Sequence, residues 1–330
     1  MGSQFYSPVL QHSNTPVIQF TRTPVGFFML NYSHYDVVII GGGPAGMAVA
    51  VGASSAGLKR ILLLERHPRL GGILNQCIHV GFGLRYFKEE LTGTEYAARY
   101  HKLFQQTGVE VKTRSFVHKI SGHQEVTFVC PQGEFLVPAD HIVLATGCRE
   151  RTREMLTIPG TRPAGIFTAG LAQEMVNIHG LLPGKNVVVI GSGDIGLIMA
   201  RRMTLEGAKV LAVLEILDHL SGLVRNKIQC LDDFGIPLYL SHETLEIMGK
   251  NRVEGIRYRD NTTGKENEMA CDTLLFSVGL IPERDLLIDT GVEPGEGIHV
   301  AGNADYVHDL VDWVTKDGEK LGRSLRNGYA

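Results

Sequence analysis

The hydrophobic residues of this chain gather in short continuous runs and do not follow an alternating pattern. Residues 37–40, 61–64, 142–144 and 187–190 each form such a run of Val, Ile and Leu. Runs of this length, bounded by turn residues, are typical of fully buried strands. The first and the last of them lead directly into a glycine-rich turn and then into a stretch with helical character. The pattern predicts an α/β fold in which strand, turn and helix alternate.

The first glycine turn has the spacing of a dinucleotide-binding motif, G-x-G-x-x-G. Its first glycine permits the tight turn, the second lets a pyrophosphate approach the backbone, and the third lets helix and strand pack closely. An acid ends the next strand about twenty residues later, where a carboxylate binds ribose hydroxyls. The residues predicted to hold this cofactor are Gly41, Gly43, Pro44, Ala45, Gly46, Glu65 and Arg66.

The same order of strand, glycines and helix recurs from residue 186 onward. A repeat of the whole unit argues against glycine turns of purely structural use. Glu215 ends the strand that follows, and an acid there accepts from a free ribose 2′-hydroxyl and repels a 2′-phosphate. NADH is therefore favoured over NADPH. The residues predicted to form this second site are Gly191, Gly193, Asp194, Ile195, Gly196 and Glu215.

Small residues also stand where other predicted strands end. Residues 89–106 have helical character, and residues 109–120 are predicted to form a strand. Apolar and polar residues alternate over 125–137, which predicts a small antiparallel element. The strand at 141–144 ends in Ala-Thr-Gly. A further cofactor contact is predicted at Gly72, because a pair of glycines after the strand that ends at Glu65 allows another close approach of backbone to cofactor.

The composition fits a globular protein with room for two domains. The chain has 330 residues, of which 44% are hydrophobic. A net charge of −3 argues against a nucleic-acid partner, and no apolar run reaches the length of a membrane span. The 5 cysteines are scattered without C-x-x-C or zinc spacing, which indicates a reducing cytoplasm. Residues 1–34 are polar and show no clear period, so we predict a disordered or loosely packed extension.

Together these elements resemble the pyridine nucleotide-disulfide oxidoreductase-like flavoproteins, with thioredoxin reductase as the architectural analogue. The resemblance rests on both glycine turns, the Ala-Thr-Gly strand end, a return crossing at 271–282 and Gly302-Asn303. It implies two Rossmann-like three-layer nucleotide-binding domains, with an NAD domain at 156–282 inserted into an FAD domain at 35–155 and 283–330. The implied cofactors are FAD and NAD(H). The resemblance also implies further cofactor contacts at Ile73, Val117, Ala145, Thr146, Gly147, Gly279, Gly302, Asn303 and His308.

The chain departs from that family at positions that matter for chemistry. Relatives usually carry Gly-Asp where this chain has Gly302-Asn303, so the residue expected at the flavin's ribityl chain has no charge. A helix expected from near His308 would point its N-terminus at the flavin ring. No cysteine pair follows Gly72, and no C-x-x-C occurs between residues 160 and 276, which argues against a dithiol mechanism.

The candidates for catalysis are Cys77, His79 and His308. Cys77 is either a sulfenate-forming thiol, a charge-transfer partner or a buried small hydrophobe. Each histidine either hydrogen-bonds within the structure or moves a proton at the flavin. Cys148, just after the Ala-Thr-Gly strand end, is expected to be structural and without a partner.

Residues 70–79, 191–206 and 307–312 resemble a subgroup without redox cysteines. Its members are electron-transferring subunits beside anaerobic glycerol-3-phosphate dehydrogenase-like, opine oxidase-like and hydrogen cyanide synthase-like flavoproteins. The resemblance predicts a cytoplasmic FAD-dependent NADH oxidoreductase subunit that exchanges electrons with a partner flavoprotein or iron–sulfur protein. The alternatives are a stand-alone NADH oxidase or peroxidase using Cys77, and a nucleotide-binding module without turnover. The oligomeric state stays open.

Overall fold

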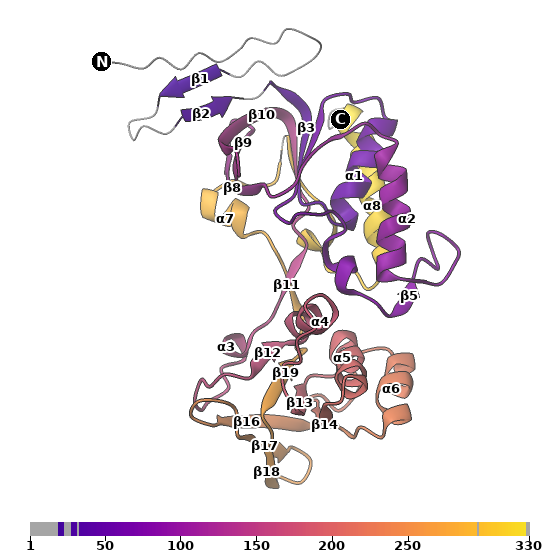
Figure 1. The fold of residues 1–330 in the computed structure, drawn as a ribbon, viewed down its shortest axis with the longest axis vertical. Helices are drawn as coiled ribbons and strands as arrows, with labels where there is room; N and C mark the ends of the chain where they lie inside the picture. The colour runs from indigo at the N-terminus through magenta and orange to yellow at the C-terminus, as the bar shows by residue number, and fades with distance from the viewer. Residues whose placement is uncertain (1–18, 23–27, 32, 296, 328–330) are drawn as a thin grey trace.

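The computed structural model describes residues 19–22, 28–31, 33–295 and 297–327. These residues form two lobes joined by a crossing, as Figure 1 shows. The upper lobe in that view contains elements from both ends of the chain, and the lower lobe contains the middle.

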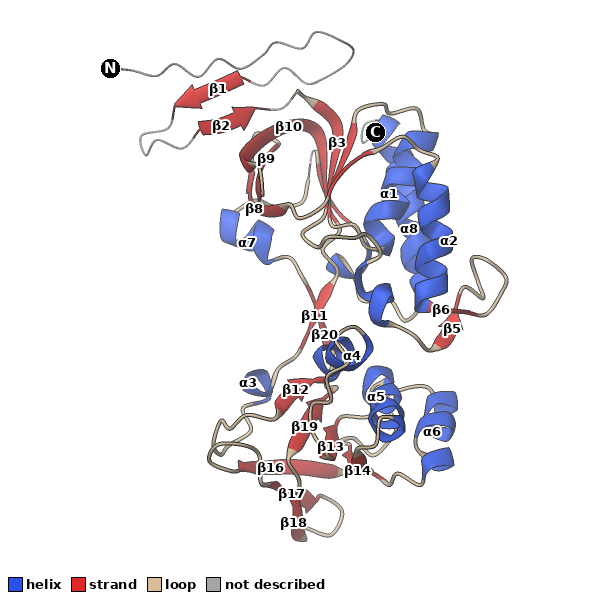
Figure 2. Ribbon diagram, viewed as in Figure 1, coloured by secondary structure: helices blue, strands red, loops and turns tan. Residues whose placement is uncertain are grey.

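The upper lobe is built around a parallel sheet with the strand order β21-β10-β3-β4-β7. Helices α1, α2 and α8 cover one face of it, and an antiparallel meander of β8, β9 and the first half of β10 covers the other (Figure 2). The lobe therefore has three layers. The bounds are β3 (Tyr35–Ile40), α1 (Pro44–Ser55), β4 (Ile61–Leu64), α2 (Gly93–Gln105), β7 (Glu110–Lys112), β8 (Phe116–Ser121), β9 (Glu125–Cys130), β10 (Gly133–Leu144), β21 (Ile298–Val300) and α8 (Val311–Ser324).

The lower lobe repeats this three-layer plan. Its parallel sheet has the order β12-β19-β13-β14-β15, with α4, α5 and α6 packed on one face and the antiparallel strands β16, β17 and β18 on the other. The bounds are β12 (Ile166–Thr168), α4 (Ala169–Asn177), β13 (Asn186–Ile190), α5 (Asp194–Leu205), β14 (Lys209–Leu214), α6 (Val224–Cys230), β15 (Leu238–Tyr239), β16 (His242–Met248), β17 (Gly255–Asp260), β18 (Glu266–Ala270) and β19 (Thr273–Phe276).

The chain crosses between the lobes at two strands that pair with each other. β11 (Cys148–Glu150) runs antiparallel to β20 (Leu280–Pro282). The lower lobe is thus inserted into the upper one, and the predicted fold class is confirmed. The boundaries given above for the two domains stay a prediction. The remaining elements are β5 (Val80–Phe82), β6 (Leu91–Thr92), α3 (Arg153–Leu156), α7 (Asp285–Thr290) and short 3-10 helices at Gly72–Gln76, Asp232–Phe234, Gly302–Ala304 and Leu325–Asn327.

The single strand predicted over residues 109–120 is divided between two sheets. β7 stays in the parallel sheet, whereas β8 opens the meander. The break falls at Arg114, which has a φ of 53°, and at Ser115, whose N–H donates to the carbonyl of Glu65 at 2.9 Å. The helix predicted over 89–106 begins later, at Gly93, because Thr92 and Glu95 form a capping box there.

Part of the N-terminal extension is in strands. β1 (Gln19–Arg22) pairs with β2 (Phe28–Asn31), and β2 pairs in parallel with β10. The backbones of these strands hydrogen-bond to one another and, through β2, to the edge of the meander. The disordered or loosely packed extension stays a prediction. The prediction for residues 1–18, 23–27 and 32 lies outside the described residues.

The first and last helices of the upper lobe pack at very short range. A Cβ on Gly52 of α1 would lie 2.2 Å from the carbonyl oxygen of Glu319, and one on Gly322 of α8 would lie 2.1 Å from that of Val49. Only glycine fits at these positions. The close packing fixes the C-terminal helix, whose first turn faces the nucleotide site described below.

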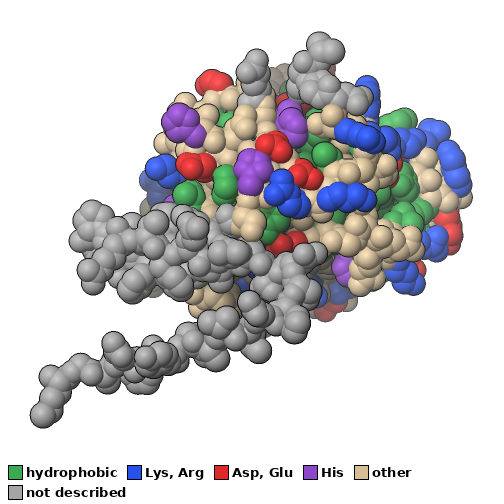
Figure 3. All heavy atoms as spheres, turned by 90° about the horizontal axis from the view of Figure 1, so that it is seen from above, with side chains coloured by type: hydrophobic (Ala, Val, Ile, Leu, Met, Phe, Trp, Pro, Cys, Tyr) green, Lys and Arg blue, Asp and Glu red, His purple; other side chains and the backbone are tan. Residues whose placement is uncertain are grey.

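The surface and the helix lengths bear on possible partners. On the end of the molecule seen in Figure 3, charged side chains of both signs are interspersed. Among the described residues, none of the helices combines the length and the apolar character needed to cross a bilayer.

We expect Gly322→Ala to lower the free energy of unfolding by about 1–3 kcal/mol, because the added carbon overlaps the backbone of α1. Denaturant unfolding of the FAD-loaded protein measures this. Gly122→Ala is the control, since a Cβ there meets nothing within 4 Å. Equal stability of the two variants would contradict the packing described for α1 and α8.

Candidate functional site

A cavity of about 2090 Å³ lies between the lobes. It is lined by the glycine turns of both lobes, by the crossing strands and by the start of α8. Pockets for one small molecule usually measure about 300–1,000 Å³. The cavity is therefore large enough for two nucleotides.

The first glycine turn packs against the segment between β10 and β11, which leads from the upper lobe to the lower one. Gly41 has a φ of 108°, and a Cβ there would lie 2.4 Å from the carbonyl oxygen of Ala145. Glu65 holds the turn from the other side: its Oε2 accepts from the N–H of Gly42 at 2.7 Å, and its Oε1 accepts from the N–H of His67 at 2.7 Å. The buried carboxylate therefore fixes the turn and stays beside the cavity.

The second turn repeats this arrangement. A Cβ on Gly191 would lie 2.2 Å from the carbonyl oxygen of Ser277. Oε2 of Glu215 accepts from the N–H of Ser192 at 2.8 Å and from the hydroxyl groups of Ser192 and Ser221 at 2.7 and 2.9 Å. Burial raises the pKa of Glu215, but these hydrogen bonds and one from Leu217 outweigh burial, so its net pKa is lowered. Glu215 is therefore an anion at neutral pH.

Both turns fit a pyrophosphate. Gly43 and Gly193 precede α1 and α5, and neither of these N-cap residues has a side chain that could cap its helix. The N–H of Gly196 in α5 donates to Oγ of Ser277 at 3.0 Å, and the N–H groups before it are positioned to bind an anion. A Cβ on Gly43 would meet only the Cα of Gly72, at 3.9 Å, so the space before this helix is open.

Most of the predicted cofactor residues line the cavity. Gly46, Gly196 and Gly302 do not, because each is a close-packing position behind it: a Cβ on Gly46, for example, would lie 1.9 Å from the carbonyl oxygen of Gly41. The predicted residues that line it are Gly41, Gly43, Pro44, Ala45, Glu65, Arg66, Gly72, Ile73, Val117, Ala145, Thr146, Gly147, Gly191, Gly193, Asp194, Ile195, Glu215, Gly279, Asn303 and His308.

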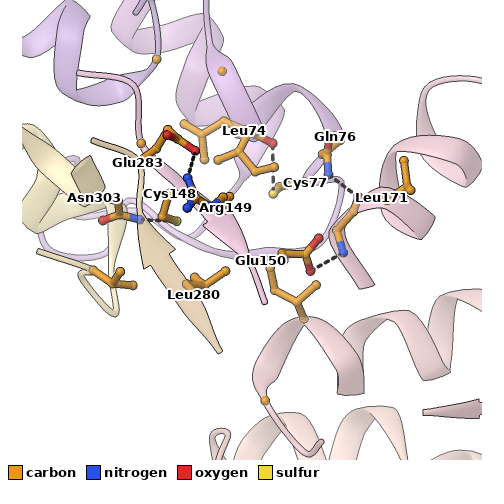
Figure 4. A pocket seen from close by; sticks show the side chains of 18 of the residues that line it. Leu74, Gln76, Cys77, Cys148, Arg149, Glu150, Leu171, Leu280, Glu283 and Asn303 are labelled. Atoms are coloured by element: carbon orange, nitrogen blue, oxygen red, sulfur yellow. Dashed lines mark hydrogen bonds and ion pairs between the residues drawn. The ribbon is translucent and has the colours of Figure 1, made fainter. Parts of the chain in front are cut away.

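Asn303 uses both ends of its side-chain amide within the protein. Its Oδ1 accepts from the N–H of His308 at 3.0 Å, and its Nδ2 donates to Sγ of Cys148 at 3.7 Å (Figure 4). Cys148, which we expected to be without a partner, therefore has one. An aspartate at position 303 could accept from His308 but could not donate to the sulfur.

Cys77 lines the cavity but is 6% exposed. Its Sγ lies 3.3 Å from the carbonyl oxygen of Ile73 and 3.7 Å from Oε1 of Gln173, and its single S–H can donate to either. Burial raises its pKa to about 12, so the thiol stays protonated at neutral pH. Of the readings open for Cys77, the buried small side chain fits these contacts.

The two histidines lie in different parts of the cavity. His79 is half-buried and faces charged groups of the lower lobe. Burial lowers its pKa, Asp194 raises it, and Arg201 and Arg225 lower it further. His308 lies just before α8, with its Nε2 3.8 Å from Oδ2 of Asp317. The helix expected from near His308 begins at Val311.

Several residues at the seam between the lobes were not predicted. Gln76 donates to the carbonyl of Gly170 at 2.9 Å, while Glu150 accepts from the N–H of the same residue at 2.7 Å, so the start of α4 is held from two sides (Figure 4). Arg149 forms ion pairs with Glu283 at 2.8 Å and Asp285 at 2.6 Å. No local motif marks these positions, because their partners are distant in sequence.

A cavity lined by one glycine turn from each of two nucleotide-binding lobes defines a flavoprotein oxidoreductase with two dinucleotide domains. The chain belongs to the pyridine nucleotide-disulphide oxidoreductase family, whose match spans residues 35–306. The predicted family is confirmed. Members of the family bind FAD and NAD(P)H, so the prediction of these cofactors and of an FAD-dependent oxidoreductase is confirmed at the level of the family.

The chain is similar to proteins of several activities. One subunit of the opine oxidase of Rhizobium meliloti is 28% identical over 289 residues, which cover 78% of this chain and 52% of the relative. One subunit of the alkyl hydroperoxide reductase of Staphylococcus aureus is 27% identical over 264 residues, which cover 78% and 49%. Thioredoxin reductase of T. acidophilum superposes with a TM-score of 0.71 at 24% identity and covers 89% of this chain and 98% of that one. The chain spans about half the length of the curated relatives it matches.

We expect Cys77 to resist alkylation in the folded protein. A pKa raised from 9.0 to about 12 lowers the thiolate fraction at neutral pH by roughly a thousandfold. Mass spectrometry after timed iodoacetamide treatment gives the order of labelling, with the less buried Cys130 as the internal reference. Labelling of Cys77 ahead of Cys130 would show a reactive thiolate and overturn this assignment.

Proposed function

We propose that the chain is an FAD-dependent NADH oxidoreductase and the flavoprotein subunit of a multi-subunit dehydrogenase. Electrons would pass between NAD(H), bound FAD and a partner redox protein. The continuous cavity supports this proposal most strongly, because both glycine turns line it. Two nucleotides held there would share one cavity, as the transfer of a hydride over a short distance requires.

The residues of each lobe have distinct parts in this proposal. The turn at Gly41–Gly46, with Glu65 and the segment from Gly302 to His308, would hold FAD, and the turn at Gly191–Gly196, with Glu215, would hold the nicotinamide nucleotide. FAD, when bound, supplies the redox chemistry, accepting a hydride from NADH and releasing electrons singly or in pairs. The free N–H groups at the start of each helix would bind phosphate.

The charge of Glu215 supports a preference for NADH. Its carboxylate is ionised and beside the cavity, so it attracts a ribose hydroxyl and repels a 2′-phosphate. The four residues that follow Glu215 contain no arginine that could bind a 2′-phosphate. NADP-type recognition would require an arginine in this region.

The state of the cysteines supports a partner protein as the acceptor. All 5 are free thiols, and Cys77 is buried and protonated, which leaves the peroxidase alternative without a thiolate. The relative from opine oxidase is by its name one component of an assembly. A flavoprotein or an iron–sulfur protein would receive the electrons, and free thiols suit a reducing cytoplasm.

An anaerobic titration tests the proposal. We expect about one NADH per bound FAD to bleach the visible flavin absorption, and NADPH to do so only at much higher concentration. A colourless protein, or a flavin that ignores both nucleotides, would favour a binding module without turnover. Rapid reduction of a disulfide substrate by the chain alone would refute the role of a partner.

Glu215→Gln should narrow the preference for NADH. Loss of the negative charge removes the repulsion of a 2′-phosphate, and we expect the ratio of kcat/KM for NADH over NADPH to fall about tenfold, or ~1.4 kcal/mol. Asp218→Asn is the control, because it removes the same charge from a side chain that is 88% exposed. An unchanged ratio in Glu215→Gln would assign the preference to other residues.

A further inference from the structure

Arg225 of α6 extends from the lower lobe to the upper one. A Cβ on Gly81 of β5 would lie 2.8 Å from Nη2 of Arg225, and Nη1 of Arg225 lies 3.6 Å from Oε1 of Glu90. In Figure 1, α6 and β5 lie on the same side of the molecule, one in each lobe. Arg225 and Gly81 both line the cavity. The guanidinium group therefore stands where the two lobes meet over the cavity.

The backbone that carries Arg225 is tied to the second glycine turn. The N–H of Gly222 donates to the carbonyl of Ser192 at 2.9 Å. Oδ1 of Asp194 accepts from the N–H of Leu223 at 2.8 Å and from Nδ2 of Asn226 at 2.7 Å. The residues on both sides of Arg225 are thus fixed to the first residue of α5, where a pyrophosphate would bind.

Arg225 lines the same cavity as the residues of the second glycine turn, which a bound dinucleotide would occupy. Its adenosine ribose would lie at Glu215 and its pyrophosphate at Gly193, so the remainder continues from the lower lobe toward the upper one. Arg225 crosses the same gap. Its side chain is 46% exposed and its ion pair with Glu90 is long, so its N–H groups are accessible to a ligand.

The charges around this point favour an arginine as a phosphate ligand. Asp194 places a carboxylate at the start of α5, and that charge opposes the approach of a phosphate. Glu90, His79 and Cys230 are further titratable groups that interact with Arg225. A guanidinium group offers paired N–H donors that match phosphate oxygens, and such charge-assisted bonds are about twice as strong as neutral ones.

We infer that Arg225 binds a phosphate of the nicotinamide dinucleotide and so completes the second nucleotide site. The inference rests on the proposed function, because it requires a dinucleotide at the turn of Gly191. Arg225 is a ligand-binding residue that the glycine motif does not contain. Its side chain also contacts the other lobe. The same guanidinium group would therefore contribute both to dinucleotide binding and to the contact between the lobes.

Binding to the FAD-loaded full-length protein tests this directly. Titration calorimetry with NAD⁺ and with ADP-ribose measures the dissociation constant Kd of each for the wild type, Arg225→Gln and Arg225→Lys. We expect Arg225→Gln to raise both values about tenfold, because the lost contact is to a phosphate that both ligands carry. Arg225→Lys keeps the charge without the fork of donors and should give an intermediate Kd.

Arg201→Gln is the matched control. Arg201 lies on α5 and its guanidinium is 5.7 Å from the ring centroid of Phe234, outside the cavity lining. We expect its Kd values to stay within about twofold of the wild type. The FAD content and the visible spectrum should be the same in all four proteins, which shows that the upper lobe is intact.

Two outcomes would overturn the inference. An unchanged Kd for ADP-ribose in Arg225→Gln would show that Arg225 does not bind a phosphate. An equal rise of Kd in Arg201→Gln would show that the loss of any positive charge weakens binding. A wild-type protein that binds neither ligand would refute the proposed function itself, and that result is distinguishable because it does not depend on any variant.

Discussion

Both nucleotide turns depend on a backbone contact that admits no side chain. Gly41 lies against the carbonyl of Ala145, and Gly191 lies against the carbonyl of Ser277. In each lobe the touching carbonyl belongs to the segment that leads into the crossing between the lobes. The cofactor turn and the connection to the other lobe are therefore parts of one rigid contact. A nucleotide held by either turn is placed relative to the crossing, and hence relative to the other lobe.

The parts of the site that could be predicted from the sequence are those whose cause is local. A glycine turn needs its strand, helix and acid within a few tens of residues, so Gly41, Glu65, Gly191 and Glu215 are recognisable together. The strand expected over 109–120 failed for a reason that is not local: Ser115 leaves the sheet to hydrogen-bond with Glu65. Periodicity cannot show at which residue a continuous apolar segment changes from one sheet to another.

The seam between the lobes was beyond prediction for the same reason. Gln76 and Glu150 both bind Gly170, and Arg225 lies against Gly81, but each pair joins residues from separate folding units. Asn303 is an intermediate case. Its position in a motif was visible, whereas its use of both amide ends, on His308 and Cys148, required the positions of three segments at once. The Asn in place of an acid then has a structural reason, since an amide both accepts and donates, whereas an ionised carboxylate only accepts.

The pairing of β11 with β20 has a consequence for the way the chain folds. Strands hydrogen-bonded in this way hold opposite residues about 5 Å apart. The ends of the inserted lobe are therefore as near to each other as the ends of a tight hairpin turn. For the upper lobe, the entire lower lobe is equivalent to one short loop, and once the lower lobe has folded, the entropy of closing that loop no longer depends on the number of residues inside it. The early and late strands β10 and β21 can then pair as though they were neighbours in sequence.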